Sequence, residues 1–499
     1  MPPRNSGMIW SGLIRLSPDG SQTLQSQIRQ AVVTAVLDRL VPVDQPLPSC
    51  RALAESLGVA RGTVVLAFQE LVDQGFLVSR ERRGHFVNPD ALTETPRTNG
   101  ASRKPAKPKP TRDWSRHFAA RPSRFGNIAK PENWQDYPYP FIYGQFDPSL
   151  FPTNAWRECS RMALGVREIH SWAADMVDRD DPLLIEQIHA RLLPRRGIFC
   201  NPDEILVTLG AQNALYMLAT LLIGRETRIA LEDPGYPDAR NMFASVARRV
   251  DAVPVDVDGM MPEAIPRGTD IVFTTPSHQC PTTVNLSISR RHALLEKAER
   301  DDFLVIEDDY DSQFLDPGAP LPALKSLDRS GRVIHVGSLS KTLAPGLRVG
   351  FIVADRALID ELRHLRRMML RHPPANNQRA VALFLSLGHH DSLVRRLTRA
   401  AAERRAALAD ALEAHMPAAH AVMGSGGTAV WVEGPEGQPS DALAEVAQRK
   451  GVLIEPGAIF FAGGRRAPAF RLGLSSIATE RIAPGIRLLA EAAAEVGAA

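Results

Sequence analysis

The first 88 residues carry apolar side chains at the spacing of helices. Five aliphatic residues recur at every fourth position: Leu24, Ile28, Val32, Val36 and Leu40. This period predicts a helix over 23–40. Two amphipathic helices are predicted next, in LPSCRALAESLG, which ends at Gly58, and in VARGTVVLAFQELVDQG, which ends at Gly75. FLVSRERRGHFV then predicts two short strands joined by 82–84. This order of elements predicts a winged helix-turn-helix.

From about Asp113 onward, apolar strands alternate with helices. Six nearly continuous apolar runs predict strands over 204–208, 227–233, 270–277, 303–310, 332–338 and 348–354. Because helical stretches separate strands that are apolar on both faces, we expect a mainly parallel sheet covered on both sides. From about His372 a helix rich in Ala, Leu and Arg leads to a mixed segment ending in FRLGLSS. The body is therefore predicted to be α/β, with a large sheet domain and a smaller α+β lobe.

A polar segment separates these two regions. Asn88–Arg112 contains five prolines and six Lys or Arg residues, and it has almost no large apolar side chains. A segment of this composition cannot bury a core of its own, so it is expected to be a linker. We predict a first domain over 1–88, a basic Pro-rich linker over 89–112 and a body over 113–499.

Composition narrows the class of protein further. Of the 499 residues, 44% are hydrophobic and 23% charged, as in ordinary globular proteins. The longest apolar run, 214–224, is about half of a membrane span, and the N-terminus lacks the apolar run of a secretory signal. Four separated cysteines have no metal-binding spacing, so we expect no disulfide, no metal and a cytoplasmic protein.

The positive charge is concentrated in the N-terminal quarter. Residues 1–130 hold 19 Lys or Arg against 10 Asp or Glu, although the whole chain has a net charge of only +3. This asymmetry indicates a small anion-binding module attached to a mildly acidic body.

The predicted winged helix has basic residues where DNA-binding domains need them. Arg61 and Thr63 begin its second short helix, whose N-terminus can enter a major groove. Four further residues can meet phosphates or a minor groove: Arg51 in the preceding helix, and Arg82, Arg83 and His85 in the wing. The alternative is a helical protein-interaction domain with solvated arginines. The full set of elements, together with the basic linker, favours double-stranded DNA.

The segment from Leu47 to Val87 resembles the GntR-type winged helix nearly position by position. The family pattern LPSSRxLAxxLGVSRxTVxxAYxxLxxxGxLxxxxGxGxFV is matched here by LPSCRALAESLGVARGTVVLAFQELVDQGFLVSRERRGHFV. Two departures are visible: Cys50 replaces a common Ser, and Arg82, Arg83 and His85 replace small wing residues.

Three strand ends in the body carry side chains suited to one cofactor. Lys341 follows a buried strand, where a desolvated amine can form a Schiff base. Asp308 ends another strand and can pair with a pyridinium nitrogen. Gly210–Gln212 lies at a helix N-terminus, where phosphate can bind.

Each of these features alone has an ordinary explanation, such as a surface lysine, a strand cap or a simple turn. Their order along the chain, with Arg348 seven residues after Lys341, favours pyridoxal 5'-phosphate (PLP) as cofactor.

The whole body resembles the fold-type-I, class I aminotransferases, which have the PLP-dependent transferase fold. The resemblance rests on the following motifs: GxxDPSLFPxxxW (Gly144–Trp156), RRGI, TLGAQNAL, EDPGYP, TPSHQxPT, EDDYDSQF, SLSKTLAPGLRVG and FRLGLSS. Joined to a winged helix, such a body resembles the MocR/GabR-type regulators, in which TPSHQ and EDDYDSxF are characteristic.

This resemblance implies a role for each site residue. Lys341 would form the internal aldimine, Asp308 would pair with the pyridine nitrogen, and Tyr310 would contact the phenolic oxygen. The implied phosphate ligands are Ser338, Arg348, Gly210, Ala211 and Gln212. Tyr236 would cover the ring face. Arg471 would bind the carboxylate of an amino acid, with Arg240 as a second candidate.

The sequence also departs from its relatives around the site. In the stretch Y-x-D-P-x-G-x-x-x-L-R, the Tyr, Gly and Arg positions read Asp175, Asp180 and Ile185, and Thr283 replaces a Gly. In relatives that Tyr reaches the phosphate of the neighbouring subunit, so we expect this contact to be lost. RDDPLLIEQI and HQCPTT resemble a subgroup associated with taurine and ectoine utilisation.

These observations predict a PLP-dependent transcriptional regulator. It would sense a small amine or amino acid by forming an external aldimine at Lys341, and would bind an operator with two half-sites as a homodimer. One alternative is an active aminotransferase that carries a DNA-binding domain; another is a cofactor-free dimerisation scaffold. We expect transamination to be at most a slow half-reaction.

Overall fold

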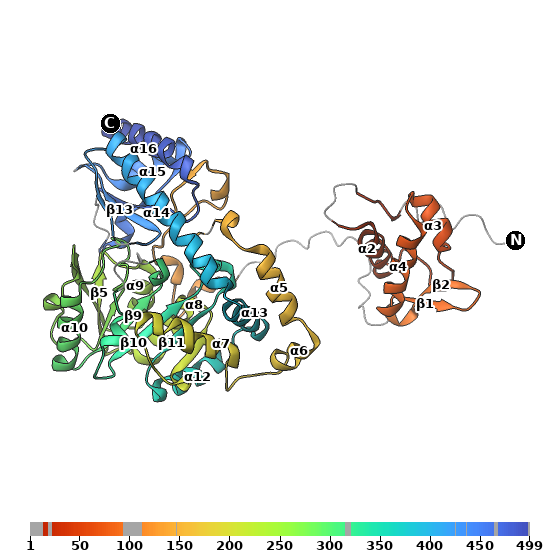
Figure 1. Cartoon of the computed structure of the whole chain (residues 1–499), viewed down its shortest axis with the longest axis horizontal. Helices are drawn as coiled ribbons and strands as arrows, with labels where there is room; N and C mark the ends of the chain where they lie inside the picture. Colours follow the sequence, from red (N-terminus) through yellow and green to blue (C-terminus); the bar gives the residue numbers. More distant parts are fainter. Residues whose placement is uncertain are drawn as a thin grey trace. The chain divides into compact units, whose positions relative to one another are not determined.

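The computed structural model describes residues 13–17, 22–92, 112–145, 147–314, 321–424, 426–435, 437–463 and 468–497. The chain divides into two compact units, Met1–Arg116 and His117–Ala499 (Figure 1).

The first unit is a winged helix-turn-helix. Its elements are α2 (Leu24–Leu37), α3 (Cys50–Leu57), α4 (Arg61–Asp73), β1 (Leu77–Arg80) and β2 (Gly84–Val87). The Ser49 hydroxyl accepts a hydrogen bond from the Ala52 N–H at the start of α3, and Gly58, at φ 67°, ends this helix. The apolar faces of the three helices enclose one core around Val64 and Phe68.

This unit extends beyond the predicted boundary at residue 88. The 3₁₀ turn η1 (Pro89–Leu92) follows β2, and Leu92 packs against the core of the unit. The Leu92 carbonyl also accepts a hydrogen bond from Arg39 Nη2 at 3.2 Å. Most of the predicted linker, residues 93–111, lies outside the described residues.

The second unit is built on an eight-stranded sheet of order β4-β11-β10-β9-β8-β5-β6-β7. The strands are β4 (Ile205–Thr208), β5 (Arg228–Asp233), β6 (Arg249–Asp256), β7 (Gly259–Met260), β8 (Ile271–Thr274), β9 (Leu304–Asp309), β10 (Val333–Ser338) and β11 (Gly350–Val353). β10, β9, β8, β5 and β6 pair in parallel, whereas β11 runs antiparallel to both of its neighbours. The predicted mainly parallel sheet is confirmed.

Helices cover both faces of this sheet (Figure 1). One layer consists of α8 (Gly210–Leu222), α9 (Pro237–Ala244) and α12 (Arg356–Leu370). The opposite layer includes α5 (Thr153–Ala163), α7 (Pro182–Gln187), α10 (Ile288–Asp301) and α13 (Ala375–Ser386). Adjacent strand residues alternate between these layers, so that Ile306 packs on α8 and α12, whereas Val305 packs on α10.

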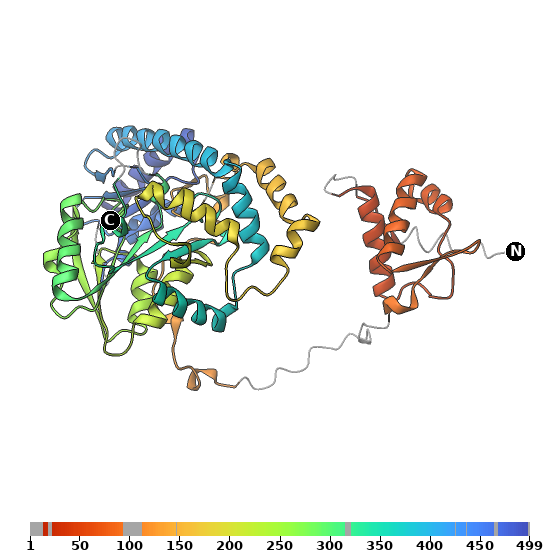
Figure 2. The same cartoon turned by 60° about the horizontal axis from the view of Figure 1, so that its bottom comes forward.

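A smaller lobe carries a four-stranded sheet of order β12-β13-β16-β15. Its strands are β12 (His420–Val422), β13 (Ala429–Glu433), β15 (Glu455–Pro456) and β16 (Ala469–Gly473), and it is packed by α15 (Ser440–Arg449) and α16 (Ile482–Gly497). The long helix α14 (His389–His415) joins the lobes, because Leu393 lies in the core of the large domain and Leu408 in that of the small lobe (Figure 2). β3 (Tyr139–Pro140) pairs with β14 (Val452–Leu453).

No helix in the described part of the chain is both long and apolar enough to span a bilayer.

Candidate functional site

A cavity of about 330 Å³ opens at the carboxyl ends of the parallel strands. Nine of the predicted residues line it: Ala211, Gln212, Tyr236, Asp308, Tyr310, Ser338, Lys341, Arg348 and Arg471. The cavity lies between the large sheet and the small lobe, because Asp308 and Ser338 come from β9 and β10, whereas Arg471 comes from β16. This is the edge at which α/β sheets usually bind their ligands.

Lys341 lies just beyond β10, with its amine inside the cavity. The Nζ atom is 4.2 Å from the centre of the Tyr143 ring. Burial lowers the pKa of Lys341, although the nearby Asp311 carboxylate opposes the effect. A lowered pKa increases the neutral fraction of the amine, which is the nucleophilic form.

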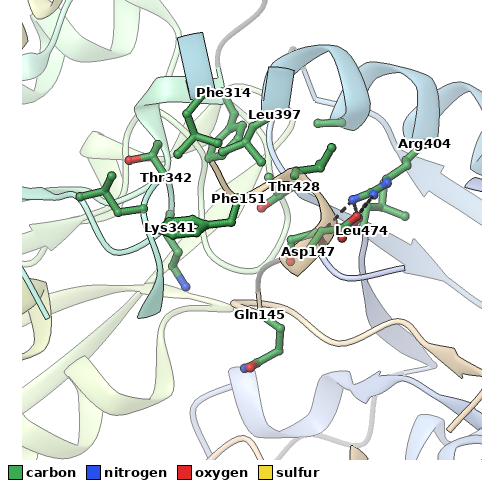
Figure 3. Close-up of a pocket in the computed structure, with 15 residues that line it drawn as sticks. Gln145, Asp147, Phe151, Phe314, Lys341, Thr342, Leu397, Arg404, Thr428 and Leu474 are labelled. Carbon is green, nitrogen blue, oxygen red and sulfur yellow. Dashed lines mark hydrogen bonds and ion pairs between the residues drawn. The ribbon is translucent and has the colours of Figure 1, made fainter. Parts of the chain in front are cut away.

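A second cavity of about 30 Å³ lies on the other side of Lys341. Figure 3 shows the amine of Lys341 directed away from Phe314 and Leu397, which line this smaller cavity. Arg404 Nη2 forms an ion pair with Asp147 Oδ2 at 2.5 Å at its far end. The apolar lining holds the lysine stem, so that the amine faces the larger cavity.

The surroundings of Asp308 suit a carboxyl group that pairs with a bound cationic group. It is 3% exposed, and its Oδ1 atom has no hydrogen-bond partner among the described residues. Burial, and then the charge of Asp309, raise the pKa of Asp308 to about 8. Asp309 differs, because it is paired with Arg196 Nε at 2.9 Å and Ser277 Oγ at 2.5 Å. A protonated pyridine nitrogen would satisfy Asp308.

The opposite end of the cavity fits a phosphate. Gly210, at φ 77°, begins α8, and a Cβ atom there would lie 3.2 Å from Arg348 Nη2. Arg348 also donates to the Leu209 carbonyl at 3.0 Å. The buried Ser340 hydroxyl has no hydrogen-bond partner in the described part of the chain, and it lines the same wall as Ser338. Helix N-terminus, guanidinium and hydroxyls together form an anion cradle.

Two tyrosines flank the space between these ends. The Tyr236 hydroxyl lies 2.8 Å from Gln212 Oε1 and 3.0 Å from Asp238 Oδ2. The Tyr310 hydroxyl donates to the His278 carbonyl at 2.8 Å, so its proton is directed to the backbone. Burial raises the pKa of both hydroxyls, and both therefore stay protonated at neutral pH.

Arg471 lines the cavity on the side of the small lobe. Its neighbours there were not predicted as site residues from the sequence. Its Nε atom donates to Glu455 Oε2 at 2.7 Å, and its guanidinium lies 4.4 Å from the centre of the Tyr143 ring. Glu455, Tyr143 and Cys280 all line the cavity. The strand register places Glu455 directly opposite Arg471, but sequence patterns do not give register between separate strands.

The structure does not support Arg240 as a ligand of an amino acid. Its Nη1 and Nη2 atoms donate to the Phe460 and Ile459 carbonyls at 3.0 and 2.6 Å. Arg240 is also not among the residues that line the cavity in the described chain. Its guanidinium instead joins α9 to the turn before β16.

The acidic departures from the family pattern have partners of their own. Asp175 is exposed and forms ion pairs with Arg371 and His372, and the hydrogen bond from Arg371 lowers the pKa of Asp175. Asp180 is buried and accepts hydrogen bonds from Arg366 Nη1 at 2.6 Å and from Arg363 Nη1 at 3.1 Å. The charge of Asp175 is therefore paired at the surface, and Asp180 joins α12 to the loop that precedes α7.

The replacement of glycine by Thr283 keeps the backbone geometry that a glycine would adopt. Thr283 has φ 65°, a conformation that costs a side-chain-bearing residue some strain. It is 5% exposed, and its side chain lies near the Val422 carbonyl in the small lobe.

The predicted DNA-binding residues take different positions in the first unit. Arg61 is the exposed first residue of α4, and Thr63, two residues later in the same turn, is half-buried. Arg82 and Arg83 are exposed at the tip of the wing. Arg51 is exposed and lies 3.1 Å from Glu55, an arrangement worth little energy in water.

His85 lies in the wing strand β2 but is half-buried. Its ring packs edge-on against Phe68, with centroids 5.2 Å apart, and burial lowers its pKa. The strand alternation of β2 directs His85 towards α4. The sequence analysis also missed Val65 and Leu66, which are 37% and 55% exposed on α4. They occupy positions of α4 outside the periodic core face.

Among the residues that the structure describes, no cluster of three or more His, Cys, Asp or Glu side chains is placed to hold a metal ion.

Comparisons with known proteins match both units. The family "Aminotransferase class I and II" matches residues 167–487, and "Bacterial regulatory proteins, gntR family" matches residues 24–87. The match to the first family covers more than half of the chain.

Two relatives match most of the chain. The chain is 44% identical to the HTH-type transcriptional regulator TauR of Rhodobacter capsulatus, over 96% of this chain and 98% of that protein. It is 33% identical to the probable rhizopine catabolism regulatory protein MocR of Rhizobium meliloti, over 79% and 78% of the two chains.

A solved structure resembles the body alone. The alpha-aminoadipate aminotransferase LysN of Thermus thermophilus, in complex with N-(5'-phosphopyridoxyl)-L-leucine, superposes with a TM-score of 0.69 at 27% identity. The match covers 77% of this chain and 99% of that chain.

Proposed function

The chain is an HTH-type transcriptional regulator of the MocR type, with a gntR-family winged helix and a class I and II aminotransferase domain, and we propose that this domain binds PLP at Lys341 and senses a small amine. Membership of the aminotransferase family implies dependence on PLP.

One observation supports this proposal most strongly. Two buried polar atoms, Asp308 Oδ1 and Ser340 Oγ, face one cavity without a hydrogen bond to the described residues, and the Lys341 amine lies in the same cavity. An amine, a carboxylate and a hydroxyl of this kind match the aldehyde, the pyridine nitrogen and the phosphate of PLP. Leaving such groups unsatisfied costs free energy that the cofactor would recover.

Each side chain of the cavity would bind a different part of PLP. When bound, PLP supplies an aldehyde that condenses reversibly with primary amines. Lys341 would hold the cofactor through its amine, whose lowered pKa increases its neutral fraction, and Asp308 would keep a proton on the pyridine nitrogen. Arg348, Ser338, Ser340 and the N-terminus of α8 would bind the phosphate.

The ligand would enter beside the same lysine. Its amine would take the place of the Lys341 amine on the cofactor, and its anionic group would lie on Arg471. Lys341 Nζ and the Arg471 guanidinium lie 4.2 and 4.4 Å from the centre of the same Tyr143 ring, so one small ligand can reach both. Small amino acids and amino sulfonates have these dimensions.

The first unit would bind DNA. Arg61 at the N-terminus of α4 is placed to read base edges in a major groove, and Arg82 and Arg83 can meet phosphates beside it. We further propose a homodimer that binds an operator with two half-sites, acting in the cytoplasm where the chromosome is.

Reduction of the purified protein with borohydride, followed by peptide mass mapping, tests the cofactor assignment. We expect a yellow protein in which reduced pyridoxyl is attached at Lys341, and loss of this adduct when the protein is incubated with a ligand amine beforehand. Lys341→Ala should carry no adduct, whereas Lys130→Ala, which alters another lysine lining the cavity, should keep it. An adduct at another lysine in the wild-type protein would refute the assignment.

A further inference from the structure

The guanidinium that is expected to bind the anionic group of the ligand already has a buried counter-ion. Arg471 and Glu455 are 3% and 4% exposed, and Arg471 Nε donates to Glu455 Oε2 at 2.7 Å. The two residues are directly opposed on β16 and β15 of the small lobe, so the strand register itself fixes the pair.

Glu455 is held firmly in this position. Its other oxygen, Oε1, accepts the backbone N–H of Tyr143 at 3.1 Å. Tyr143 in turn lies between the two expected anchors of the ligand, since Lys341 and Arg471 both contact its ring. A carboxylate fixed through both oxygens cannot turn away when a ligand arrives.

The ion pair with Glu455 limits which guanidinium nitrogens of Arg471 are available to bind a ligand. With Nε committed to Glu455, the guanidinium has its Nη1 and Nη2 atoms left for a ligand, and Nη1 lies 3.5 Å from Cys280 Sγ. The positive charge of Arg471 is balanced by Glu455 in a desolvated wall, where charge interactions are much stronger than in water. A ligand with one anionic group can still accept hydrogen bonds from Nη1 and Nη2 of Arg471. A second anionic group near Arg471 would be repelled by the Glu455 carboxylate.

We propose that Glu455 is a specificity-determining residue that admits amines bearing a single anionic group and excludes dicarboxylic amino acids. The inference rests on the proposed function of the cavity as an amine-sensing site, and it defines the class of ligand further. Glu455 acts by charge, because its carboxylate is hydrogen-bonded to the same guanidinium that the anionic group of the ligand would approach.

Two anions that lack an amine isolate this effect from any chemistry at Lys341. The test compares propionate, a monoanion, with succinate, a dianion, by ligand-observed NMR titration of the full-length protein. For wild-type protein we expect the dissociation constant of succinate to exceed that of propionate by about tenfold or more, from repulsion across a few ångströms in a poorly solvated wall. Wild-type protein that binds both anions equally would overturn the proposal without any variant.

Variants then assign the effect to Glu455. Glu455→Gln should lower the succinate-to-propionate ratio of dissociation constants by about tenfold, because the repelling charge is removed. Glu455→Asp keeps the charge and should retain the wild-type preference. Glu433→Gln makes the same change at an exposed end of β13 and should leave the ratio unaltered.

The possible outcomes are distinct. An unchanged ratio in Glu455→Gln, or a lost preference in Glu455→Asp, would overturn the charge-based role of Glu455. Failure of the amine-sensing proposal would instead appear as the absence of a borohydride adduct at Lys341, which neither propionate nor succinate requires.

Discussion

Gly144 sets the space available to the amine of Lys341. It has φ 77°, and a Cβ atom at this position would lie 2.9 Å from Lys341 Nζ. We expect Gly144→Ala to weaken PLP binding by about tenfold or more, because misplacing a reacting group by roughly 1 Å is costly. Absorbance titration of the apoprotein with PLP measures this affinity.

Gly388 provides a matched control for this substitution. It also has φ 77°, but no atom lies within 4 Å of the position that its Cβ would take. Both alanine variants should lose about 1–2 kcal/mol of folding stability through the left-handed backbone, and Gly388→Ala should bind PLP normally. Equal PLP affinities in the two variants would show that Gly144 is needed for its backbone alone.

The buried carboxyl of Asp308 predicts an unusual pH dependence of the apoprotein. Its pKa is about 8 in the folded protein, against about 3.9 in an unfolded chain. Between these values the folded state binds more protons than the unfolded state, so the free energy of unfolding must fall as pH rises. The slope cannot exceed about 1.4 kcal/mol per pH unit for one group.

Urea denaturation between about pH 5 and pH 8 measures this slope against the linkage relation. Asp308→Asn cannot ionise and should flatten the profile, and saturating PLP should flatten it too by pairing the carboxylate. A wild-type apoprotein whose stability rises over this range by as much as that of Asp308→Asn would contradict the environment described for Asp308.

Sequence order revealed some site residues but not others. Lys341, Asp308 and Arg348 could be predicted because each lies at a strand end within a recognisable motif. Tyr143 and Glu455 could not, because their contact joins positions 312 residues apart and depends on how the lobes fold together. The half-buried position of His85 could not be predicted, since a basic residue between Gly84 and Phe86 gives no sign of which face it takes.

At the scale of elements, the apolar runs located the central strands but not their directions. All six predicted strands exist, with ends that differ by up to three residues. β11 proved antiparallel, because hydrophobicity does not encode strand direction. β6 was missed, since it is exposed at alternate positions and contains Pro254, which is typical of strands near a sheet edge.

Helix α4 and the wing are expected to contribute differently to DNA binding. Arg61→Ala should reduce discrimination between operator and unrelated DNA by about 1–3 kcal/mol if Arg61 reads a base edge. Arg82→Ala should weaken binding to all sequences alike and reduce the salt dependence by roughly one phosphate contact. Fluorescence anisotropy at several salt concentrations separates these effects. An equal loss of affinity for operator and unrelated DNA in Arg61→Ala would show that Arg61 does not read a base.

For the molecule as a whole, we expect sensing without efficient catalysis. The structure retains Lys341 and Asp308, so the first step with an amine is chemically available. Asp175, which the sequence analysis expects at the position of a phosphate-binding tyrosine, is paired with Arg371 and His372 and supplies no hydroxyl. We therefore expect transamination well below about 1 s⁻¹, the low end of ordinary enzyme rates.

A steady-state assay with taurine, diaminobutyrate and common amino acids against 2-oxo acids measures this rate. Turnover above about 1 s⁻¹ would identify an aminotransferase that also binds DNA. Spectral change of the bound cofactor without turnover would agree with a sensor.

If one amine-binding cavity controls DNA binding, an amine that binds there must change the affinity of the protein for its operator. The measurement uses the promoter fragment upstream of the protein's own gene and the amine, from taurine, β-alanine and diaminobutyrate, that most changes the cofactor spectrum. We predict that this amine shifts the operator affinity of the wild-type protein by about fivefold or more, while Lys341→Ala binds the operator but does not respond. An equal shift in Lys341→Ala would contradict the account.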